Sequence, residues 1–582
     1  MKLFKKIFFL LAVVSLSSCD DMLDPDLDGT LSEDAVWSNN NLAFGFLNNA
    51  YNNLPNGYNR ISNAMFAAAT DDAICPDPLS SINGFNDGTW SSFNVIDDVW
   101  SKNYEGIRKV NTFLEKIDDV PLPKQSNALG TDESILNTRN RMKGEAHFLR
   151  AYFYFELVKR YGGVPLTKTV LSSSEAIDMP RSSVDECFEF IIEECDLAAQ
   201  ELPRKYGASP TIVGFNEAKD IGRATSGAAL ALKSRALLYW ASPLFNETND
   251  VSRWEMAAEA ADAVINYTTN EDGSGGNVYS LQRFSSTLTM STLFSTNSVL
   301  PQYHDELIFS TNYNNNTTVE QLNAPISYGA KGLTNPTQNL VESFPMSNGK
   351  PITDATSGYN PDDPFSNRDP RLNMTVLANG TNFEVNDKTG VLETFEGGID
   401  GLGAYPNATQ TGYYLQKYIM PYAVWEGRSV NVTRTWVLIR LAEMYLNFAE
   451  ARNEAVGPDD DVYFALRSLR FRAGFRPVYV PTGLTQDEMR KFIQNERRLE
   501  LAFEEHRFFD VRRWKLFDDP SERDNLLTIR GVKITKDTSS GNLIYDTNNV
   551  IQERVFSNKM YLYPIPESEI NKSSALEQNP DW

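Results

Sequence analysis

The chain has 582 residues, of which 41% are hydrophobic and 23% are charged, and no long low-complexity tract interrupts it. This length is too great for one simple core, so we expect two or more packed regions or an extended helical array. The formal charge of −23 repels polyanions, which argues against nucleic acid as the main ligand.

The beginning of the chain has the pattern of a lipoprotein leader. Residues 1–18 combine a basic start, an apolar run from Ile7 to Leu16 and small residues, which is typical of a secretory signal peptide. The apolar run is too short to remain as a membrane-spanning helix. Leu16-Ser17-Ser18-Cys19 resembles a bacterial lipobox and predicts lipidation of Cys19, with an ordinary signal peptide and a chance cysteine as the alternative. Several acyl chains on Cys19 would anchor the protein durably in a membrane.

Residues 19–37 form an acidic stretch with Pro and Gly, which suits a tether leading away from the membrane. Residues 38–267 then carry apolar side chains at three- and four-residue spacing, which predicts an N-terminal helical region. The predicted helices cover about 41–54, 99–117, 138–161, 183–202, 225–240 and 253–267. Alternating small and large side chains in the last two predict a tetratricopeptide-like hairpin. We interpret Cys75, Cys187 and Cys195 as small packing residues.

Residues 268–432 are rich in Asn, Gly, Ser, Thr, Pro and Tyr and lack helical periodicity. Long irregular insertions in compact proteins are commonly functional, so we expect this region to form part of a ligand-binding face, with short strands near 305–311 and 412–419. Residues 433–582 return to helical patterns. Within them, 434–455 and 460–475 repeat the plan of a helix pair.

One segment of the C-terminal region is densely charged: "NERRLELAFEEHRFFDVRRW", residues 495–514. As a single helix it places Glu496, Glu500 and Glu504 on one stripe beside an apolar side. The acids would repel one another unless arginines neutralise them, and the segment supplies Arg497, Arg507, Arg512 and Arg513 for this purpose. A catalytic acid would instead need an isolated apolar pocket that raises its pKa, so we predict a structural ion network.

No sequence motif indicates catalysis. The three histidines, His147, His304 and His506, share no motif, and no zinc, phosphate-loop, nucleotide-binding or nucleophile-elbow pattern occurs. We therefore predict no catalytic residue, no metal site and no cofactor. A hydrolase whose two carboxylates lie far apart in the sequence remains open as an alternative.

Five stretches together carry a family resemblance. They are, in chain order, "RAYFYFELVKRYGGVPL" at 150–166, "NRDPRL" at 367–372, "LIRLAEMYLNFAEARNEA" at 438–455, the charged segment 495–514 and the final 561–582. Together and in this order they resemble the SusD/RagB family of outer-membrane lipoproteins of Bacteroidota, which capture nutrients, mostly glycans. The resemblance implies a mainly α fold of four tetratricopeptide-like helix pairs with long irregular ligand-binding loops and a few short strands. It also implies a partner, a SusC-like TonB-dependent outer-membrane barrel. Asp20 and Asp21 resemble the signal for the cell surface. Glu505 and Asp581 depart from the pattern, because glycine is usual at both places.

The candidate ligand-binding residues are aromatic side chains in polar loops. Sites for neutral sugars pair aromatic planes with amides, carboxylates or guanidiniums. "NGFNDGTWSSFN" at 83–94 contains Trp90 and Phe93, and the long irregular region contains Tyr303, Tyr313 and Tyr328. The alternative for each is that it clamps a loop onto the scaffold. We rank Trp90 first and expect Trp90→Ala to weaken glycan retention without lowering the melting temperature.

The predicted function follows from these features. We expect a lipid-anchored, non-enzymatic protein on the exterior of the outer membrane that binds an oligosaccharide and delivers it to a SusC-like TonB-dependent transporter. Two alternatives stay open: a peptide ligand in the same kind of uptake system, and a surface glycoside hydrolase with dispersed acids.

Overall fold

The computed structural model describes residues 32–122, 132–204, 206, 220, 222–270, 272–273, 275–284, 290–296, 304–311, 314–406 and 408–582, without the side chains of 132–137, 291, 295–296 and 314–315. The predicted signal peptide, the lipidation site Cys19 and most of the acidic tether lie outside these ranges. Tyr303 and Tyr313 lie outside them as well.

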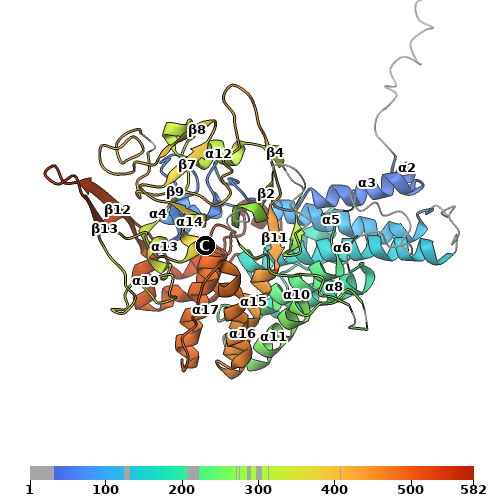
Figure 1. Cartoon of the computed structure of the whole chain (residues 1–582). Coiled ribbons are helices and arrows are strands. Elements are labelled where there is room, and N and C mark those ends of the chain that lie inside the picture. Colours follow the sequence, from blue (N-terminus) through green and yellow to red (C-terminus); the bar gives the residue numbers. More distant parts are fainter. Residues whose placement is uncertain are drawn as a thin grey trace, which may run out of the picture.

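Stacked helices form the scaffold, as Figure 1 shows. They are α3 (Asn40–Tyr51), α5 (Trp100–Lys116), α6 (Asp132–Tyr161), α8 (Val184–Glu201), α10 (Ser226–Ala241), α11 (Val251–Ile265), α15 (Leu441–Val456), α16 (Asp460–Ala473) and α17 (Gln486–Glu500). Each packs against the next from α3 to α16, and α17 packs against α15. Helices α11 and α15 pack directly against each other, so the helical array is continuous in space although the long insertion separates these two helices in the sequence. The predicted mainly α scaffold is confirmed.

Helix ends follow local sequence signals. Ser183 precedes α8, where its hydroxyl accepts the N–H of Glu186 at 3.2 Å and the Glu186 carboxylate accepts the N–H of Ser183 at 2.8 Å. Thr485 and Glu488 make the same reciprocal pair at the start of α17. Such caps satisfy N–H groups that have no partner inside the helix and contribute about 1 kcal/mol each.

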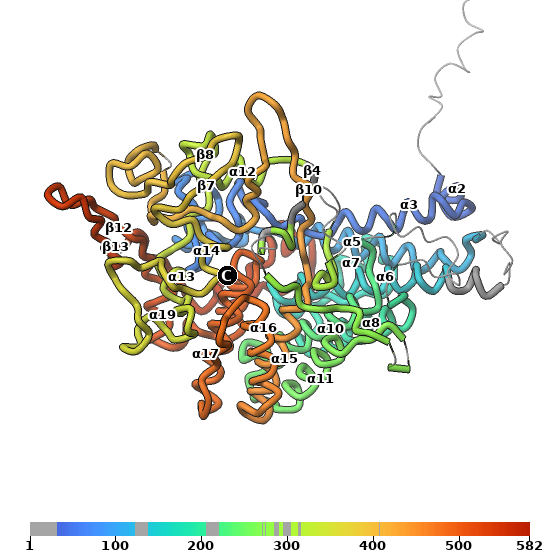
Figure 2. The backbone as a smooth tube through the Cα atoms, viewed as in Figure 1, coloured from blue at the N-terminus to red at the C-terminus, as the bar shows by residue number. Residues whose placement is uncertain are grey.

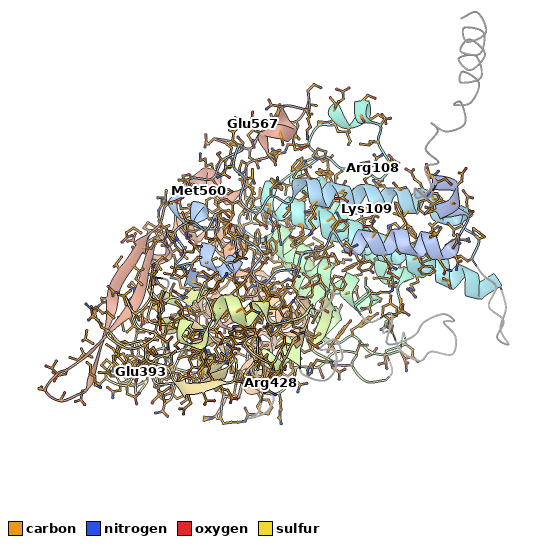
Figure 3. All side chains as sticks on the ribbon, turned by 90° about the horizontal axis from the view of Figure 1, so that it is seen from above. Arg108, Lys109, Glu393, Arg428, Met560 and Glu567 are labelled. Carbon is orange, nitrogen blue, oxygen red and sulfur yellow. The ribbon has the colours of Figure 1, made fainter. Side chains whose placement is uncertain are left out.

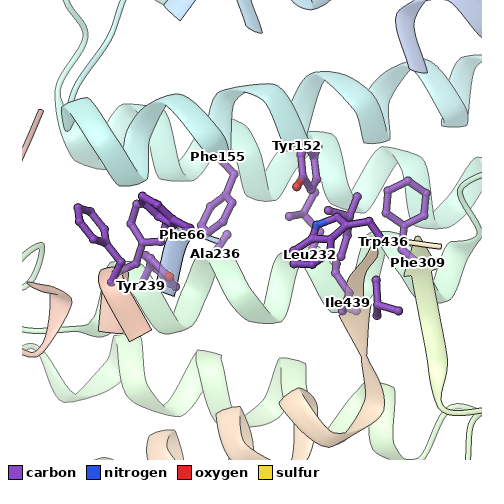
Figure 4. Close-up of a cluster of buried hydrophobic side chains, with 14 of the residues drawn as sticks. Phe66, Tyr152, Phe155, Leu232, Ala236, Tyr239, Phe309, Trp436 and Ile439 are labelled. Atoms are coloured by element: carbon purple, nitrogen blue, oxygen red, sulfur yellow. The ribbon is translucent and has the colours of Figure 1, made fainter. Parts of the chain in front are cut away.

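The core lies between the helices and the strands that cross them (Figure 4). Tyr152 and Phe155 of α6 face Leu232 and Ala236 of α10, with Trp436 beside them, and all five are almost fully buried. Alanines on α10 let the helices approach closely, while the aromatic rings fill the remaining space. The same buried cluster holds Cys75, Cys187 and Cys195 as free thiols, which confirms their predicted packing role.

Apart from β12 and β13, the strands in the described part of the chain have two to four residues, and the pairs that they form are antiparallel. The strands are β1 (Ala73–Ile74) with β5 (Asn335–Pro336); β2 (Ser295–Thr296), β10 (Val432–Arg434) and β4 (Asn314–Asn316); β3 (Leu307–Ser310) with β11 (Val437–Arg440); β6 (Val376–Leu377) with β9 (Tyr414–Leu415); β7 (Asn382–Val385) with β8 (Lys388–Val391); and β12 (Thr528–Lys536) with β13 (Leu543–Glu553). β3 and β9 confirm the two predicted strand positions.

The insertion has a small core of its own. Phe383, Val385, Leu377, Tyr414 and Ile419 form a buried cluster separate from the main one. The loops around it contain the short α-helices α12 (Thr318–Asn323), α13 (Gln338–Ser343) and α14 (Pro370–Thr375). Figure 2 shows these loops, in yellow and orange, covering one end of the helical array.

The C-terminal region contains a feature that the expected helical pattern does not include. Strands β12 and β13 form a hairpin that projects from the body (Figure 1). β-Branched residues in "TIRGVKITK" and "LIYDTNNVIQE" flank the turn "DTSSGN", which is a hairpin signal. The remaining short helices are α2 (Glu33–Trp37), α4 (Asn83–Asp87), α7 (Ser173–Ile177), α18 (Arg507–Arg513), α19 (Pro520–Leu527) and α20 (Glu567–Ile570).

The prediction of one continuous helix over 495–514 is wrong. Helix α17 ends at Glu500, and α18 begins only at Arg507. Between them Phe503 and Glu505 both have φ of 64°, in the left-handed region. A non-glycine residue pays roughly 1–2 kcal/mol for that conformation, which explains why glycine is the usual residue at the position of Glu505. Here Glu505 gains an ion pair with Arg60 at 2.7 Å.

The predicted ion network is confirmed, but its partners differ from those expected. Glu496, Glu500 and Glu504 are buried and pair with cations from other segments, namely Arg371, Lys417, Arg440, Arg470 and Arg472. The arginines of the segment do not pair with these three glutamates. Arg507 pairs with Asp71 and Arg513 with Glu450, both outside the segment, whereas Arg497 pairs with Asp510 inside it and Arg512 packs over the ring of Phe508. The network therefore connects 495–514 with distant segments of the chain, from Asp71 near the start of the described residues to Arg472. Among the described residues, no helix has both the length and the apolar character needed to cross a membrane.

Candidate ligand-binding cleft

Two tight turns frame a polar cleft at the amino-terminal side of the fold. In the first turn the N–H of Ala64 donates to the carbonyl of Ile61 at 2.9 Å, and the central residues Ser62 and Asn63 have φ of 44° and 63°. Two successive positive φ values are characteristic of a type I′ hairpin turn, for which Asn is well suited and Ser is not. Non-glycine residues held in this conformation concentrate at functional sites.

The second turn presents Phe93. Ser91 and Asn94 exchange backbone hydrogen bonds of 3.0 and 3.2 Å, which leaves Phe93 near the tip with 83% of its surface exposed. The N–H of Glu567, labelled in Figure 3, holds the turn by donating to the carbonyl of Ser92 at 2.9 Å. Phe93 thus has the exposure that the predicted ligand contact requires.

Trp90 is not exposed, so this part of its predicted role is wrong. The indole is 2% exposed and lies edge-on to Phe85, Tyr563 and Trp582, with ring centroids 4.9, 5.1 and 4.7 Å away. Polar neighbours in the sequence suggested an open loop, but the loop folds back against the C-terminal segment 561–582. Trp90 therefore anchors the turn that presents Phe93.

Tyr328 is also a packing residue in this structure. It is 6% exposed, its ring packs edge-on against Phe383 at 5.0 Å, and its hydroxyl donates to the Phe383 carbonyl at 3.4 Å. Of the candidate aromatic residues, Phe93 alone is both described and exposed. Tyr303 and Tyr313 stay predictions, because they lie outside the described residues.

The cleft itself has a volume of about 560 Å³, and the turns supply part of its wall. Its lining is Asn53, Pro55, Asn56, Arg60, Ile61, Ser62, Ser81, Asn94, Val95, Ile96, Asp97, Asp98, Val99, Lys102, Asn103, Glu156, Arg160 and Glu505. The exposed amides of Asn56 and Asn94 have no hydrogen-bond partner within the described ranges, whereas the hydroxyls of Ser62 and Ser81 lie 2.6 Å apart. These polar residues were not among those predicted from the sequence. The density of Asn and Gly in "NNLPNGYNRISN" at 52–63 was the available signal.

Paired charges form the floor of the cleft. Arg160 contacts both Asp97 and Glu156 at 2.7 Å, and Arg60 contacts Asp97 and Glu505. Burial acts to raise the pKa of Asp97, but the guanidiniums of Arg160 and Arg60 lower it more. In the same way Lys159 and Arg160 overcome burial and lower the pKa of Glu156 to about 2. These carboxylates are charged and rigidly held, so they are poor proton donors.

Asp98 differs from the other carboxyl groups of the lining. Partial burial raises its pKa, although its carboxylate also accepts the N–H of Trp100 at 3.0 Å at the start of α5. A two-carboxylate hydrolase in this cleft would need Asp98 as its acid, because the neighbouring acids are paired with arginines. Across the described ranges, no three His, Cys, Asp or Glu side chains are grouped so that they could hold a metal ion.

The chain is similar over most of its length to proteins of one kind. Residues 299–582 match the SusD family, and residues 23–238 match a family described as starch-binding associating with outer membrane. SusD-like protein P38 of Formosa agariphila is 30% identical over 212 residues, which are 35% of this chain and only 39% of that relative.

Solved structures cover more of the chain. A SusD-like protein from Bacteroides fragilis is 28% identical, with a TM-score of 0.74 over 95% of this chain and 99% of its own. A SusD-like carbohydrate binding protein from the same organism is 22% identical, with a TM-score of 0.70 over 93% of this chain and 100% of its own, and it shows the same fold.

Proposed function

Because the chain belongs to the SusD/RagB family, we propose that it is a cell-surface lipoprotein that binds an oligosaccharide and delivers it to a SusC-like TonB-dependent transporter of the outer membrane. The cleft beside Phe93 carries the proposal. Its rim holds neutral amides and hydroxyls, and the exposed Phe93 belongs to the same turn as the lining residue Asn94. Sugar rings pack their C–H faces on such rings and bond their hydroxyls to such groups. The proposed anchor at Cys19 rests on the lipobox-like residues Leu16-Ser17-Ser18-Cys19, and the proposed exterior location rests on the family resemblance.

The pairing of charges favours binding over hydrolysis. Asp97, Glu156 and Glu505 each lie against an arginine. Glycoside hydrolysis requires one carboxylic acid with a raised pKa and a second free carboxylate across the bond. Asp98 has the first property, but the other acids of the lining are paired with arginines, so none of them is the free second carboxylate, and we infer that the protein releases its ligand unchanged.

The expected affinity is modest. Stacking that covers about 100 Å² of Phe93 would contribute about 2.5 kcal/mol. Association costs roughly 4 kcal/mol or more, so the polar rim must supply the rest. Weak binding suits a protein that passes its ligand to a transporter.

A peptide ligand is the competing hypothesis. It would favour an apolar groove with free backbone donors, whereas Asn, Ser, Asp, Lys and Arg account for most of this lining. A screen that offers neutral polysaccharides and peptides side by side separates the two hypotheses, since retention of peptides alone would overturn the glycan proposal.

Affinity gels with a panel of neutral polysaccharides test the proposal directly. Phe93→Ala should raise the Kd for a retained glycan by up to roughly 70-fold, from the 2.5 kcal/mol above, and leave the melting temperature unchanged. Phe464→Ala is the matched control, because Phe464 is 63% exposed on α16, an element that contributes no residue to the lining of the cleft, whereas Phe93 shares a turn with the lining residue Asn94. An unchanged Kd for Phe93→Ala would remove the cleft from the proposal.

Two further measurements test the other parts of the function. Release of reducing ends that disappears in Asp98→Asn would show hydrolysis and contradict a pure binding role. Affinity purification from detergent-solubilised outer membranes should recover a TonB-dependent barrel with the full-length protein. Recovery of the protein alone, under conditions that keep such complexes intact, would contradict delivery to a transporter.

A further inference from the structure

A second polar cleft adjoins the first. It has a volume of about 430 Å³ and is lined by Gly45, Asn48, Asn49, Tyr51, Asn52, Leu54, Gly222, Arg223, Ser310 and Thr311. The two clefts lie on either side of one short segment, because Asn52 and Leu54 line the second while Asn53 and Pro55 line the first.

Cations orient two amides of the second cleft. The Oδ1 of Asn48 accepts a hydrogen bond from Arg223 at 2.8 Å, and the Oδ1 of Asn49 accepts one from the Nζ of Lys109 at 3.2 Å. Since each amide oxygen is engaged, the NH₂ group of each side chain is left to donate to a ligand. Arg223 is itself held by Glu145 at 2.8 Å, which fixes the geometry.

The same lysine links the two clefts. The Nζ of Lys109 also donates to the Oδ1 of Asn53 at 2.9 Å, and Asn53 lines the first cleft. Figure 3 shows Lys109 on α5, and α5 packs directly against α3. Asn49 lies in the last turn of α3 and Asn53 lies two residues beyond its end, and the shared contact with Lys109 keeps the two Oδ1 atoms within about 6 Å of each other. That spacing is short enough for neighbouring units of one oligosaccharide.

Gly45 leaves the far end of the second cleft open. A Cβ atom at this position would meet nothing within 4 Å, although the residue lies inside α3. Glycine in a helix interior costs about 1 kcal/mol relative to alanine, so its presence disfavours the helix that carries it. The bare backbone instead allows a flat ligand to approach the exposed amides closely.

We propose that the second cleft is a further subsite for a neutral glycan, so that the ligand is an extended oligosaccharide spanning both clefts. This inference rests on the proposed function of the first cleft. The charges of the second cleft support a neutral ligand, because Arg223 is already paired with Glu145 and Asp220. The remaining polar side chains of its lining are amides and hydroxyls.

Chain-length dependence tests the proposal. The probes are size-fractionated oligosaccharides prepared from a polysaccharide that the full-length protein retains in the gels, titrated by calorimetry. The variant is Asn49→Ala combined with Asn52→Ala, since both side chains are exposed and the Asn52 amide has no hydrogen-bond partner within the described ranges. Asn41→Ala is the control, because Asn41 is exposed on the same helix outside the cleft.

The wild-type protein should bind long oligosaccharides more tightly than short ones. The double variant should lose roughly tenfold in affinity for long chains, from two hydrogen bonds of ordinary strength, and nothing for short chains. Equal loss for all lengths, no loss for long chains, or a wild-type affinity independent of length would each overturn the second subsite while leaving the first intact. Failure of Phe93→Ala to weaken any of these probes would instead overturn the proposed function.

Discussion

Trp90 offers the sharpest test of how this fold presents its ligand-binding surface. The indole lies between three aromatic rings and is almost fully buried, so Trp90→Ala would leave a large cavity. Replacing a buried tryptophan by alanine costs about 3–5 kcal/mol. A domain is stable by only about 5–15 kcal/mol, so this loss is severe.

A second substitution separates ring packing from hydrogen bonding. The Nε1 of Trp90 is buried and has no acceptor within the described ranges. An unsatisfied buried N–H costs about 1–3 kcal/mol, and Trp90→Phe removes it while keeping an aromatic ring. We therefore expect Trp90→Phe to change stability by less than about 1.5 kcal/mol.

Denaturant unfolding measures both variants. Trp90→Ala should lower the midpoint strongly at constant m, and Trp90→Phe should leave it nearly unchanged. Glycan retention by Trp90→Ala should fall only together with the folded fraction, because the residue anchors the turn of Phe93. A Trp90→Ala protein of unchanged stability that no longer binds glycan would refute this reasoning and restore Trp90 as a ligand contact.

Other predictions concern the buried ion network. Arg440→Met should destabilise the protein by about 3–5 kcal/mol in denaturant unfolding, because it removes one of the cations that neutralise the buried Glu500 and Glu504. Arg428→Met, which removes an exposed pair, should leave the unfolding midpoint nearly unchanged. Burial opposes ionisation of Glu496, Glu500 and Glu504, yet arginines lower their pKa values below the usual 4.5. Stability from these groups is therefore full above pH 4.5 and is lost as the pH falls through their lower folded values. Unfolding free energies that rise from pH 5 to pH 3 would contradict this assignment.

Much of the scaffold could be predicted from the sequence because it depends on local periodicity. The spacing of apolar residues located α5, α8, α10 and α11 within a few residues, and Ser183 was recognisable as the cap of α8. Helix formation and capping involve groups only three or four positions apart, so their signals lie within one window of sequence. The motifs that carry the family resemblance are also short continuous stretches, so they can be recognised without knowledge of the tertiary structure.

The end of helix α17 at Glu500 could not be predicted from the local sequence pattern. Helical spacing continues through 495–514, but the chain turns at Phe503 and Glu505 in left-handed conformations. Glu505 there reaches Arg60, a residue more than four hundred positions earlier. The stabilisation that comes from a contact between residues so far apart in the sequence cannot be predicted from a local sequence pattern.

The sequence by itself determined the helical scaffold, the family and the presence of a buried charged segment. Tertiary structure alone decided which cations neutralise Glu496, Glu500 and Glu504, and which of the aromatic residues in 83–94 is exposed. Trp90 and Phe93 have the same polar neighbours, yet one is 2% and the other 83% exposed. The difference arises because residues 561–582 cover Trp90, and burial is set by which distant segments pack on a side chain.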